Sequence, residues 1–420
     1  MATEVEKLNA RFEGTIIKKV LSNTGRKAYY PHEGIPGQTA DARGTRINVT
    51  LGQAYDDDGR PLIIPELAEH FTLPIEEVFP YPQTFGIPEL RKKWAEEIRK
   101  KTPTLEGKIS LPVVTSGLAN GLTLANDLFI EDGDPLVLFD PNWGNYNLHF
   151  QNANFNRVPL YDGLRLNLTD FKTNLEMEGK KIAVLTFPSN PTGYTPTLKE
   201  ADELIQTCFE AASRDPLVAI IDDAYFGLTH EKGILKESLF GELANIHENL
   251  LAIKIDGMTK EAFAWGLRVG FITYAFKGMT DDVAKGLEDK TAGRIRGTIS
   301  NVNRPGQYAT LHALNNPNFE NSVNKARGII KGRYNLVQTL LDEHPEWSDS
   351  FSALPFNGGY YLCLDVKDVD PEIVRTTLLK SYDTGVIRTG KLLRIAYSAV
   401  PTNKIPELFD NIHSACKSLK

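Results

Sequence analysis

Short apolar runs separated by amphipathic stretches fill the middle of the chain. The runs are LPVVT (111–115), PLVLF (135–139), KIAVLTF (181–187), PLVAII (216–221), LLAIKI (250–255) and GFITYAF (270–276). Several are almost continuous Val, Ile and Leu, which is typical of strands buried on both faces of a mostly parallel sheet. Between the runs, Leu118, Leu122, Ala125 and Phe129 recur at helical spacing, and LKEADELIQTCFEAASR (198–214) is also amphipathic. This alternation predicts an α/β fold with a large, doubly wound sheet flanked by helices.

The two ends of the chain have different patterns. The first sixty or so residues are rich in Gly, Pro and Asp, and we expect extended, turn-punctuated chain there, with one strand over 47–51. After about residue 318, a long helical stretch precedes the alternating segments YYLCLDV and LLRIAYS, which predicts a smaller α+β unit. We therefore expect three parts: an N-terminal segment (1–65) that joins the small domain, a large domain (66–318) and a C-terminal small domain (319–420).

Composition narrows the class of protein. A chain of 420 residues is long enough for two domains. The formal net charge of -7 is modest for this size and gives no indication of a nucleic-acid or anionic-membrane partner. Three widely separated cysteines predict neither a metal site nor a disulfide framework. The polar first residues show no secretory signal, and no apolar run is long enough to cross a bilayer, so we expect a cytoplasmic protein.

Chemically active residues follow five of the predicted strands. They are Ser116-Gly117, Asp140-Pro-Asn-Trp143, Ser189-Asn190-Pro-Thr-Gly193, Asp222-Asp-Ala-Tyr225 and Met258-Thr259-Lys260. Ligands of open α/β sheets bind beyond the carboxyl ends of the strands. One such turn carries little information, but five at the same edge predict a single site.

These motifs resemble the class I aminotransferases, a family of pyridoxal-phosphate enzymes with the aspartate aminotransferase fold. The most specific string is T-K-x7-R-x-G, which runs from Thr259 to Gly270 and is joined by S-N-P-T-G, D-x-A-Y and an arginine at 394. The resemblance covers roughly Ile47 to Arg394. It implies a fold type I architecture, with a seven-stranded, mostly parallel sheet and a smaller α+β domain. It also implies a pyridoxal 5'-phosphate cofactor and amino-acid and 2-oxo-acid substrates.

The resemblance assigns the cofactor's reactive groups to four residues. Lys260 would carry pyridoxal phosphate as a Schiff base and later move a proton. Asp222 would keep the ring nitrogen protonated, which the cofactor needs to act as an electron sink. Tyr225 and Asn190 would bind the phenolic oxygen. Taken alone, an aspartate after a strand more often caps a turn, and a lone lysine is usually solvated.

The same resemblance supplies a phosphate site. The helix start at Gly117, Leu118 and Ala119 would present free backbone N–H groups, and Arg268 would add a guanidinium. Tyr81 would reach the phosphate of a neighbouring subunit, which implies a homodimer. Many relatives carry a hydroxyl three residues before the lysine, where this chain has Gly257, and Thr259 is not an assured replacement.

Further residues are assigned to the substrate. Trp143 would stack on the cofactor ring and, with Asn190, contact the substrate. Arg394 would bind the α-carboxylate as a bidentate pair, with Gly52 closing from the other side. Arg296 aligns with a residue that binds a side-chain carboxylate across the dimer, although a solvated basic face is an equal alternative at that position.

Other functions stay open at this stage. A β-lyase or a decarboxylase on the same fold would share the cofactor motifs, and the amino donor is not specified. A cofactor-sensing regulator would need a DNA-binding unit, and the first sixty residues contain no helix-turn-helix pattern. A nicotinamide enzyme is disfavoured, because no G-x-G-x-x-G follows any predicted strand.

Overall fold

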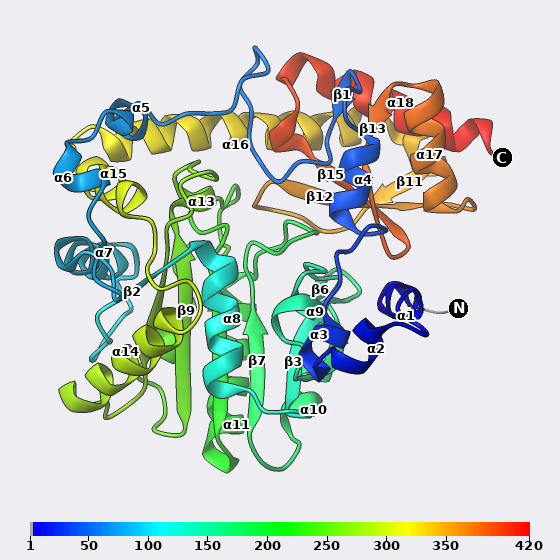
Figure 1. The fold of residues 1–420 in the computed structure, drawn as a ribbon. Coiled ribbons are helices and arrows are strands. Elements are labelled where there is room, and N and C mark those ends of the chain that lie inside the picture. Colours follow the sequence, from blue (N-terminus) through cyan, green and yellow to red (C-terminus); the bar gives the residue numbers. More distant parts are fainter. Residues whose placement is uncertain (1–2) are drawn as a thin grey trace.

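A seven-stranded sheet forms the centre of the larger part of the chain in the computed structural model, which describes residues 3–420 (Figure 1). The strand order is β2-β10-β9-β8-β7-β3-β4, and β10 runs antiparallel to the other six strands. The strands are β2 (Val113–Thr115), β3 (Pro135–Asp140), β4 (Asn154–Pro159), β7 (Lys181–Leu185), β8 (Leu217–Asp222), β9 (Leu250–Gly257) and β10 (Gly270–Ala275). The six predicted runs are all strands of this sheet. The seventh, β4, is an edge strand whose polar sequence NFNRVP gives no apolar signal.

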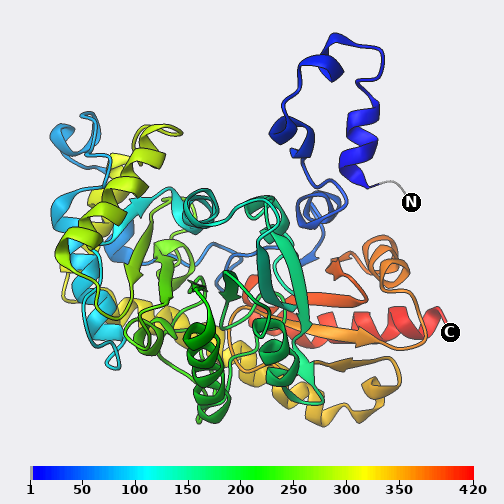
Figure 2. The ribbon, with the colours of Figure 1, turned by 90° about the horizontal axis from the view of Figure 1, so that it is seen from below.

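Helices cover both faces of this sheet. In Figure 2, α8 and α11 lie on opposite sides of the strands. Both helices match the amphipathic segments predicted from the sequence. The helices of this part are α5 (Pro65–Ala68), η1 (Glu69–Phe71), α6 (Ile75–Val78), α7 (Pro88–Lys101), α8 (Gly117–Phe129), α9 (Tyr146–His149), α10 (Leu168–Leu175), α11 (Leu198–Arg214), α12 (Phe240–Leu243), α13 (Met258–Glu261), α14 (Asp281–Arg296) and α15 (Arg304–Asn315). A two-stranded hairpin, β5 (Tyr161–Asp162) and β6 (Arg165–Leu166), also belongs here.

The C-terminal part is α+β, as predicted. The long helix α16 (Phe319–Glu343) leads into a four-stranded antiparallel sheet of order β11-β12-β15-β14. Its remaining elements are η2 (Pro345–Asp349), β11 (Phe351–Ala353), β12 (Tyr361–Val366), α17 (Pro371–Ser381), β13 (Thr384–Gly385), β14 (Ile387–Thr389), β15 (Leu392–Ala396), η3 (Tyr397–Ala399), η4 (Thr402–Lys404) and α18 (Ile405–Ser418). The short strand β1 (Ile47–Asn48) pairs with β13, so N-terminal chain joins this part.

The N-terminal segment differs from the expectation of extended chain. It contains four short helices: α1 (Glu4–Ala10), α2 (Ile16–Val20), α3 (Asn23–Lys27) and α4 (Ile35–Asp41). Local capping explains part of this error, because Thr3 and Glu6 form a capping box and Ser22 accepts a hydrogen bond from the backbone of α3. Helices α1 to α3 bury no residue and project from the rest of the chain (Figure 2). The strand expected over 47–51 is shortened to β1.

Within residues 3–420, no helix combines the length and apolar character that crossing a membrane requires.

Candidate active site

A cavity of about 150 Å3 lies at the carboxyl ends of the central parallel strands. Two elements place its principal groups: β8 ends on Asp222, and β9 leads directly into α13, which carries Lys260. The lining residues are Leu118, Ala119, Leu122, Trp143, Tyr146, Thr186, Asn190, Asp222, Ala224, Tyr225, Thr259, Lys260 and Arg268. Most of the residues predicted from the sequence are therefore brought together.

The Asp222 carboxylate is buried at the base of this cavity. The Tyr146 hydroxyl donates to Asp222 Oδ2 at 2.7 Å, and the backbone N–H of Ala224 donates to Oδ1 at 3.2 Å. Burial raises the pKa of Asp222, while Tyr146 and the ammonium of Lys260 counteract that shift. Tyr146 was missed from the sequence. Its position one turn after Trp143 was the only available signal, and a tyrosine there is equally typical of core packing.

Lys260 faces Asp222 across the cavity. Burial lowers the pKa of Lys260, the nearby Arg268 lowers it further, and the Asp222 carboxylate opposes both effects. Its Nζ atom lies 4.8 Å from the centroid of the Tyr225 ring. A lowered pKa favours the neutral amine, which is the form that attacks a carbonyl carbon.

Tyr225 and Asn190 form a pair of polar groups beside the amine. Asn190 Nδ2 approaches Tyr225 Oη at 3.5 Å, and Tyr225 donates its hydroxyl hydrogen to Tyr361 Oη at 3.1 Å. Burial raises the pKa of Tyr225 well above its usual value, so the phenol is protonated and can act as a donor. A phenolate oxygen of a bound ligand would find two donors here.

An anion cradle lies where α8 begins. Gly117 has a φ of +73°, and a Cβ atom there would stand 2.6 Å from Arg268 Nη2. Only glycine therefore allows the guanidinium to pack against the first turn of α8, whose backbone N–H groups are free to bind an anion. The arrangement suits a phosphate.

The absence of a hydroxyl at Gly257 has a steric cause. A Cβ atom at this position would lie 2.6 Å from Gly270 Cα and 2.6 Å from the Val269 carbonyl oxygen, so a serine does not fit. Thr259 lines the cavity, and its buried Oγ1 has no hydrogen-bond partner in the described part of the chain. A buried hydroxyl without a partner is costly, and a ligand oxygen would satisfy it.

Arg394 reaches the same region from strand β15. Its Nη2 donates to the Thr50 carbonyl oxygen at 2.7 Å, its Nη1 approaches Asn190 Oδ1 at 3.5 Å, and the guanidinium lies 4.5 Å from the centroid of the Tyr361 ring. The buried Nε has no acceptor among residues 3–420. At Gly52, a Cβ atom would approach Tyr361 Oη to 2.9 Å, so the backbone there is close to the same tyrosine.

Five predicted residues are not part of the cavity lining. Gly117 and Arg394 adjoin lining residues and Gly52 adjoins Tyr361, whereas Tyr81 and Arg296 do not adjoin the cavity. The Tyr81 side chain is 89% exposed, and the exposed Arg296 donates to Ser300 Oγ at 2.9 Å. The structure of one chain therefore does not bring either residue to Lys260.

Taken together, the cavity offers an amine, a buried carboxylate, a pair of donors for a phenolic oxygen and a phosphate cradle. These groups match the aldehyde, ring nitrogen, phenolic oxygen and phosphate of pyridoxal 5'-phosphate. Fold and site thus define a pyridoxal-phosphate enzyme of fold type I.

Comparison with known proteins gives the family. The family model for aminotransferase class I and II matches residues 46–412, and the chain belongs to this family. A probable aspartate/prephenate aminotransferase of Aquifex aeolicus (strain VF5) is 28% identical over 292 residues, which cover 68% of each chain. An aspartate aminotransferase of Bacillus subtilis (strain 168) is 25% identical over 69% of this chain and 68% of its own length.

Solved structures agree on the fold. An aminotransferase from Anaerococcus prevotii superposes with a TM-score of 0.81 at 22% identity, over 92% of this chain and 98% of the other. A Pyrococcus horikoshii kynurenine aminotransferase superposes with a TM-score of 0.78 at 18% identity, over 96% and 98%. The protein is a pyridoxal-phosphate-dependent aminotransferase, which moves an amino group between an L-amino acid and a 2-oxo acid. These comparisons do not favour the β-lyase and decarboxylase alternatives.

Proposed function

We propose that Arg394 binds the α-carboxylate of the amino acid and presents its Cα to Lys260. The observation that supports this role is the buried Arg394 Nε, which has no acceptor in the described part of the chain. A carboxylate between Arg394 and the Gly52 backbone would satisfy that donor in a bidentate, charge-assisted pair. Asn190, which already approaches Arg394 Nη1, would orient the guanidinium and contact the bound substrate.

The proposed roles around the cofactor follow from the same cavity. Pyridoxal phosphate supplies an electron-withdrawing ring that stabilises the negative charge left when Cα loses its proton. Lys260 would hold the cofactor covalently, and its free amine would carry the proton from Cα. Asp222, held by Tyr146, would keep the proton on the ring nitrogen. Tyr225 and Asn190 would donate to the phenolic oxygen, and Trp143 would cover the ring.

The phosphate would be held by three kinds of donor. These are the backbone N–H groups of Gly117, Leu118 and Ala119, the Arg268 guanidinium and the Thr259 hydroxyl. Thr259 would take the place of the side chain that Gly257 cannot provide, which its buried Oγ1, without a partner among residues 3–420, supports.

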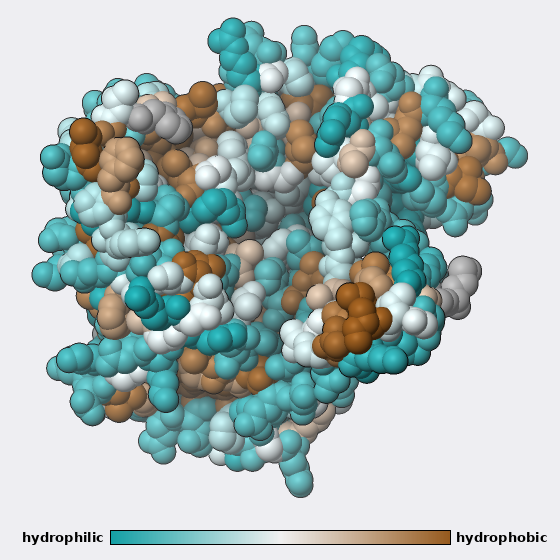
Figure 3. All heavy atoms as spheres, in the orientation of Figure 1, coloured by the Kyte–Doolittle hydropathy of each residue, from teal (hydrophilic) through white to brown (hydrophobic). Residues whose placement is uncertain are grey.

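We also propose that the active unit is a homodimer in which Tyr81 and Arg296 act on the partner subunit's site. Both are exposed in the single chain, and Ile75 and Phe79, which precede Tyr81 by six and two residues, are exposed apolar side chains as well. A second apolar patch, seen over α2 in Figure 3, contains Ile16 and Val20, each 65% exposed. Exposed apolar patches of this kind commonly mark contacts with another chain.

Arg296 would bind a side-chain carboxylate, and aspartate or glutamate would then be the amino donor. The names of the relatives from Aquifex aeolicus and Bacillus subtilis, which include aspartate, support this choice.

We further propose the division into 1–65, 66–318 and 319–420, which the pairing of β1 with β13 supports. We also propose a cytoplasmic location, which the free cysteines support.

Kinetics of Arg394→Ala test the proposed role of this arginine. Every amino acid shares the α-carboxylate, so kcat/KM should fall for all donors by at least about tenfold, the effect of losing one charge-assisted pair. Lys391→Ala, an exposed change on the same hairpin, is the control. If Arg394→Ala retained wild-type kcat/KM with every donor, the proposed binding mode would be wrong.

A further inference from the structure

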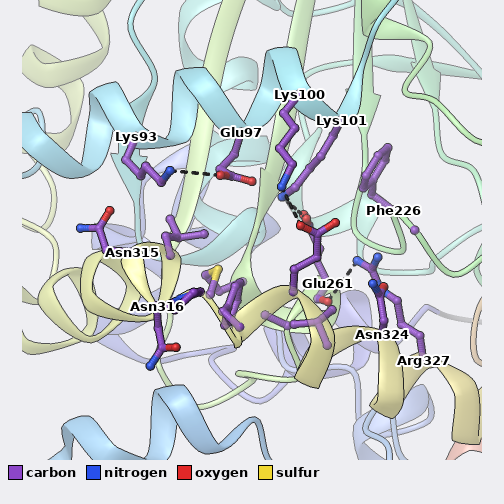
Figure 4. Close-up of a pocket in the computed structure, with 18 of the residues that line it drawn as sticks. Lys93, Glu97, Lys100, Lys101, Phe226, Glu261, Asn315, Asn316, Asn324 and Arg327 are labelled. Carbon is purple, nitrogen blue, oxygen red and sulfur yellow. Dashed lines mark hydrogen bonds and ion pairs between the residues drawn. The ribbon is translucent and has the colours of Figure 1, made fainter.

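A second cavity, of about 540 Å3, is shown in Figure 4; Met258 and Glu261 of α13 line it, whereas Thr259 and Lys260 of the same helix line the cofactor pocket. Its walls come from α7, the end of α15, the first turns of α16 and the loop after Tyr225. Its volume falls within the range of about 300–1,000 Å3 that is typical of small-molecule sites. The roles described above use none of its charged groups.

Positive charge exceeds negative charge in this cavity by two. The basic lining residues are Lys93, Lys100, Lys101, Lys236 and Arg327, and the acidic ones are Glu97, Glu261 and Glu320. Three pairs form: Lys93 with Glu97 at 3.4 Å, Lys100 with Glu320 at 2.7 Å, and Lys101 with Glu261. Within residues 3–420, Lys236 and Arg327 have no acidic partner within 4.0 Å.

Arg327 packs between α13 and the Gly227 backbone. Its Nη2 donates to the Glu261 carbonyl oxygen at 3.3 Å, and a Cβ at Gly227 would lie 2.5 Å from its Cζ atom, so glycine is required for this packing. Its buried Nε has no acceptor in the described part of the chain. Asn324, one turn earlier on α16, lies beside Arg327 in Figure 4 and adds an amide donor. A positioned guanidinium with an unsatisfied buried donor is suited to a carboxylate or a phosphate.

The rest of the wall is mixed: Thr229, Asn315 and Asn316 are polar, whereas other side chains are apolar. Phe226, Met258, Leu314, Phe319 and Val323 contribute carbon surface to the same cavity. A ligand that suits both surfaces carries an acidic group and a small apolar body.

The cavity also contacts groups that adjoin the catalytic residues. Glu261 follows Lys260 directly, and its partner Lys101 lies 4.7 Å from the centroid of the Trp94 ring. Trp94 Nε1 donates to Asp256 Oδ1 at 2.9 Å, and Asp256 lies on the strand that leads to α13. An anion that competes with Glu261 for Lys101 would therefore change the surroundings of Lys260.

We propose that this cavity is a regulatory site that binds a small metabolite through a carboxylate or phosphate group. Calorimetric titration of the holoenzyme at low ionic strength tests the proposal, with inorganic phosphate and citrate as probes. In the holoenzyme the cofactor occupies the phosphate cradle, so bound inorganic phosphate reports on another site.

Two substitutions test the charges that carry the proposal. Lys236→Glu and Arg327→Ala should each weaken binding of the better probe by about tenfold or more, the effect expected for a charge-assisted contact. Lys331→Glu and Lys325→Ala are the matched controls, because both side chains are exposed on α16 and neither lines the cavity. The controls should stay within about twofold of wild type. Lys236 is exposed and makes no hydrogen bond in the described part of the chain, so its variant tests the proposal even if Arg327→Ala fails to fold.

The outcomes separate this site from the active site. The tighter probe identifies the acidic group, and a probe that changes kcat in wild type but not in Lys236→Glu supports the regulatory role. Binding of neither probe to wild type would overturn the proposal. Equal losses in the variants and their controls would also overturn it, as would citrate binding that depends on Arg394 and not on Lys236. Transamination by the wild type is unaffected by these failures, so the amino-transfer function stands apart from this test.

Discussion

Two neighbouring aspartates at the end of β8 should give opposite mutant phenotypes. Asp222 faces the cofactor cavity and accepts from Tyr146. Asp223 is buried with Lys254 and accepts from Ser238 Oγ at 2.5 Å. Replacing each carboxylate by its isosteric amide removes one negative charge and keeps the shape. Any difference between the two variants therefore reports what each charge does.

The expected magnitudes follow from these surroundings. Asp222→Asn removes the charge proposed to hold the ring proton, and we expect kcat/KM to fall at least about a hundredfold, or roughly 2.7 kcal/mol. Its stability should be unchanged or greater, because burial raises the pKa of Asp222 and a neutral group avoids that desolvation cost. Asp223→Asn leaves the buried Lys254 with Asp256 at 3.5 Å as its remaining carboxylate. Removing one partner of a buried pair costs about 3–5 kcal/mol, and we expect the lower end because Asp256 remains.

Steady-state kinetics and urea unfolding of the cofactor-free chains measure the two effects. The cofactor is removed for unfolding because a bound ligand would add its own stabilisation. The urea midpoint of Asp223→Asn should fall with an unchanged slope, while its kcat/KM stays within a few-fold of wild type. If Asp223→Asn abolishes activity and Asp222→Asn is mild, the assignment at the end of β8 is wrong by one residue.

Further predictions concern four other positions. Lys260→Ala should lack the visible absorbance of the attached cofactor, and borohydride should fix no cofactor to it; a labelled Lys260→Ala chain would refute the attachment site. Arg296→Ala should lower kcat/KM for aspartate and glutamate by about ten- to a hundredfold and spare aromatic donors, whereas an equal loss for all donors would make Arg296 structural. Burial lowers the pKa of His149 to about 4, so its contribution to stability is complete above pH 6.5 and is lost as pH falls towards 4. Protonation of His149 in acid should lower the free energy of unfolding by on the order of 3 kcal/mol, and His149→Gln should lack this pH-dependent loss. Gly257→Ser should lower the melting temperature despite restoring a hydroxyl, because its Cβ would overlap Gly270; an unchanged melting temperature would contradict the steric account.

The sequence predicted the strands that are buried on both faces because such strands must be almost continuously apolar. It missed β4 because an edge strand can be polar, and it missed α1 to α3 because none of them buries an apolar face; local caps are present at α1 and α3. The short N-terminal helices are thus a case in which composition alone gives the wrong expectation.

Much of the candidate site was predictable because its residues follow the strands that could be recognised. Tyr146 was not, because its role depends on a contact with Asp222 76 positions away. The steric exclusion of serine at Gly257 depends on the antiparallel pairing of β9 with β10, which places Gly270 opposite it. Neither contact has a signal in the local sequence.

The most direct test of amino transfer is a half-reaction without an acceptor. Holoenzyme is mixed with aspartate, glutamate, alanine or an aromatic amino acid, and the 2-oxo acid released is compared with the enzyme present. A donor should yield one equivalent of its 2-oxo acid and leave the cofactor in its aminated form, and a second 2-oxo acid should then restore the original absorbance. Release of carbon dioxide or free ammonia without an aminated cofactor would contradict the account.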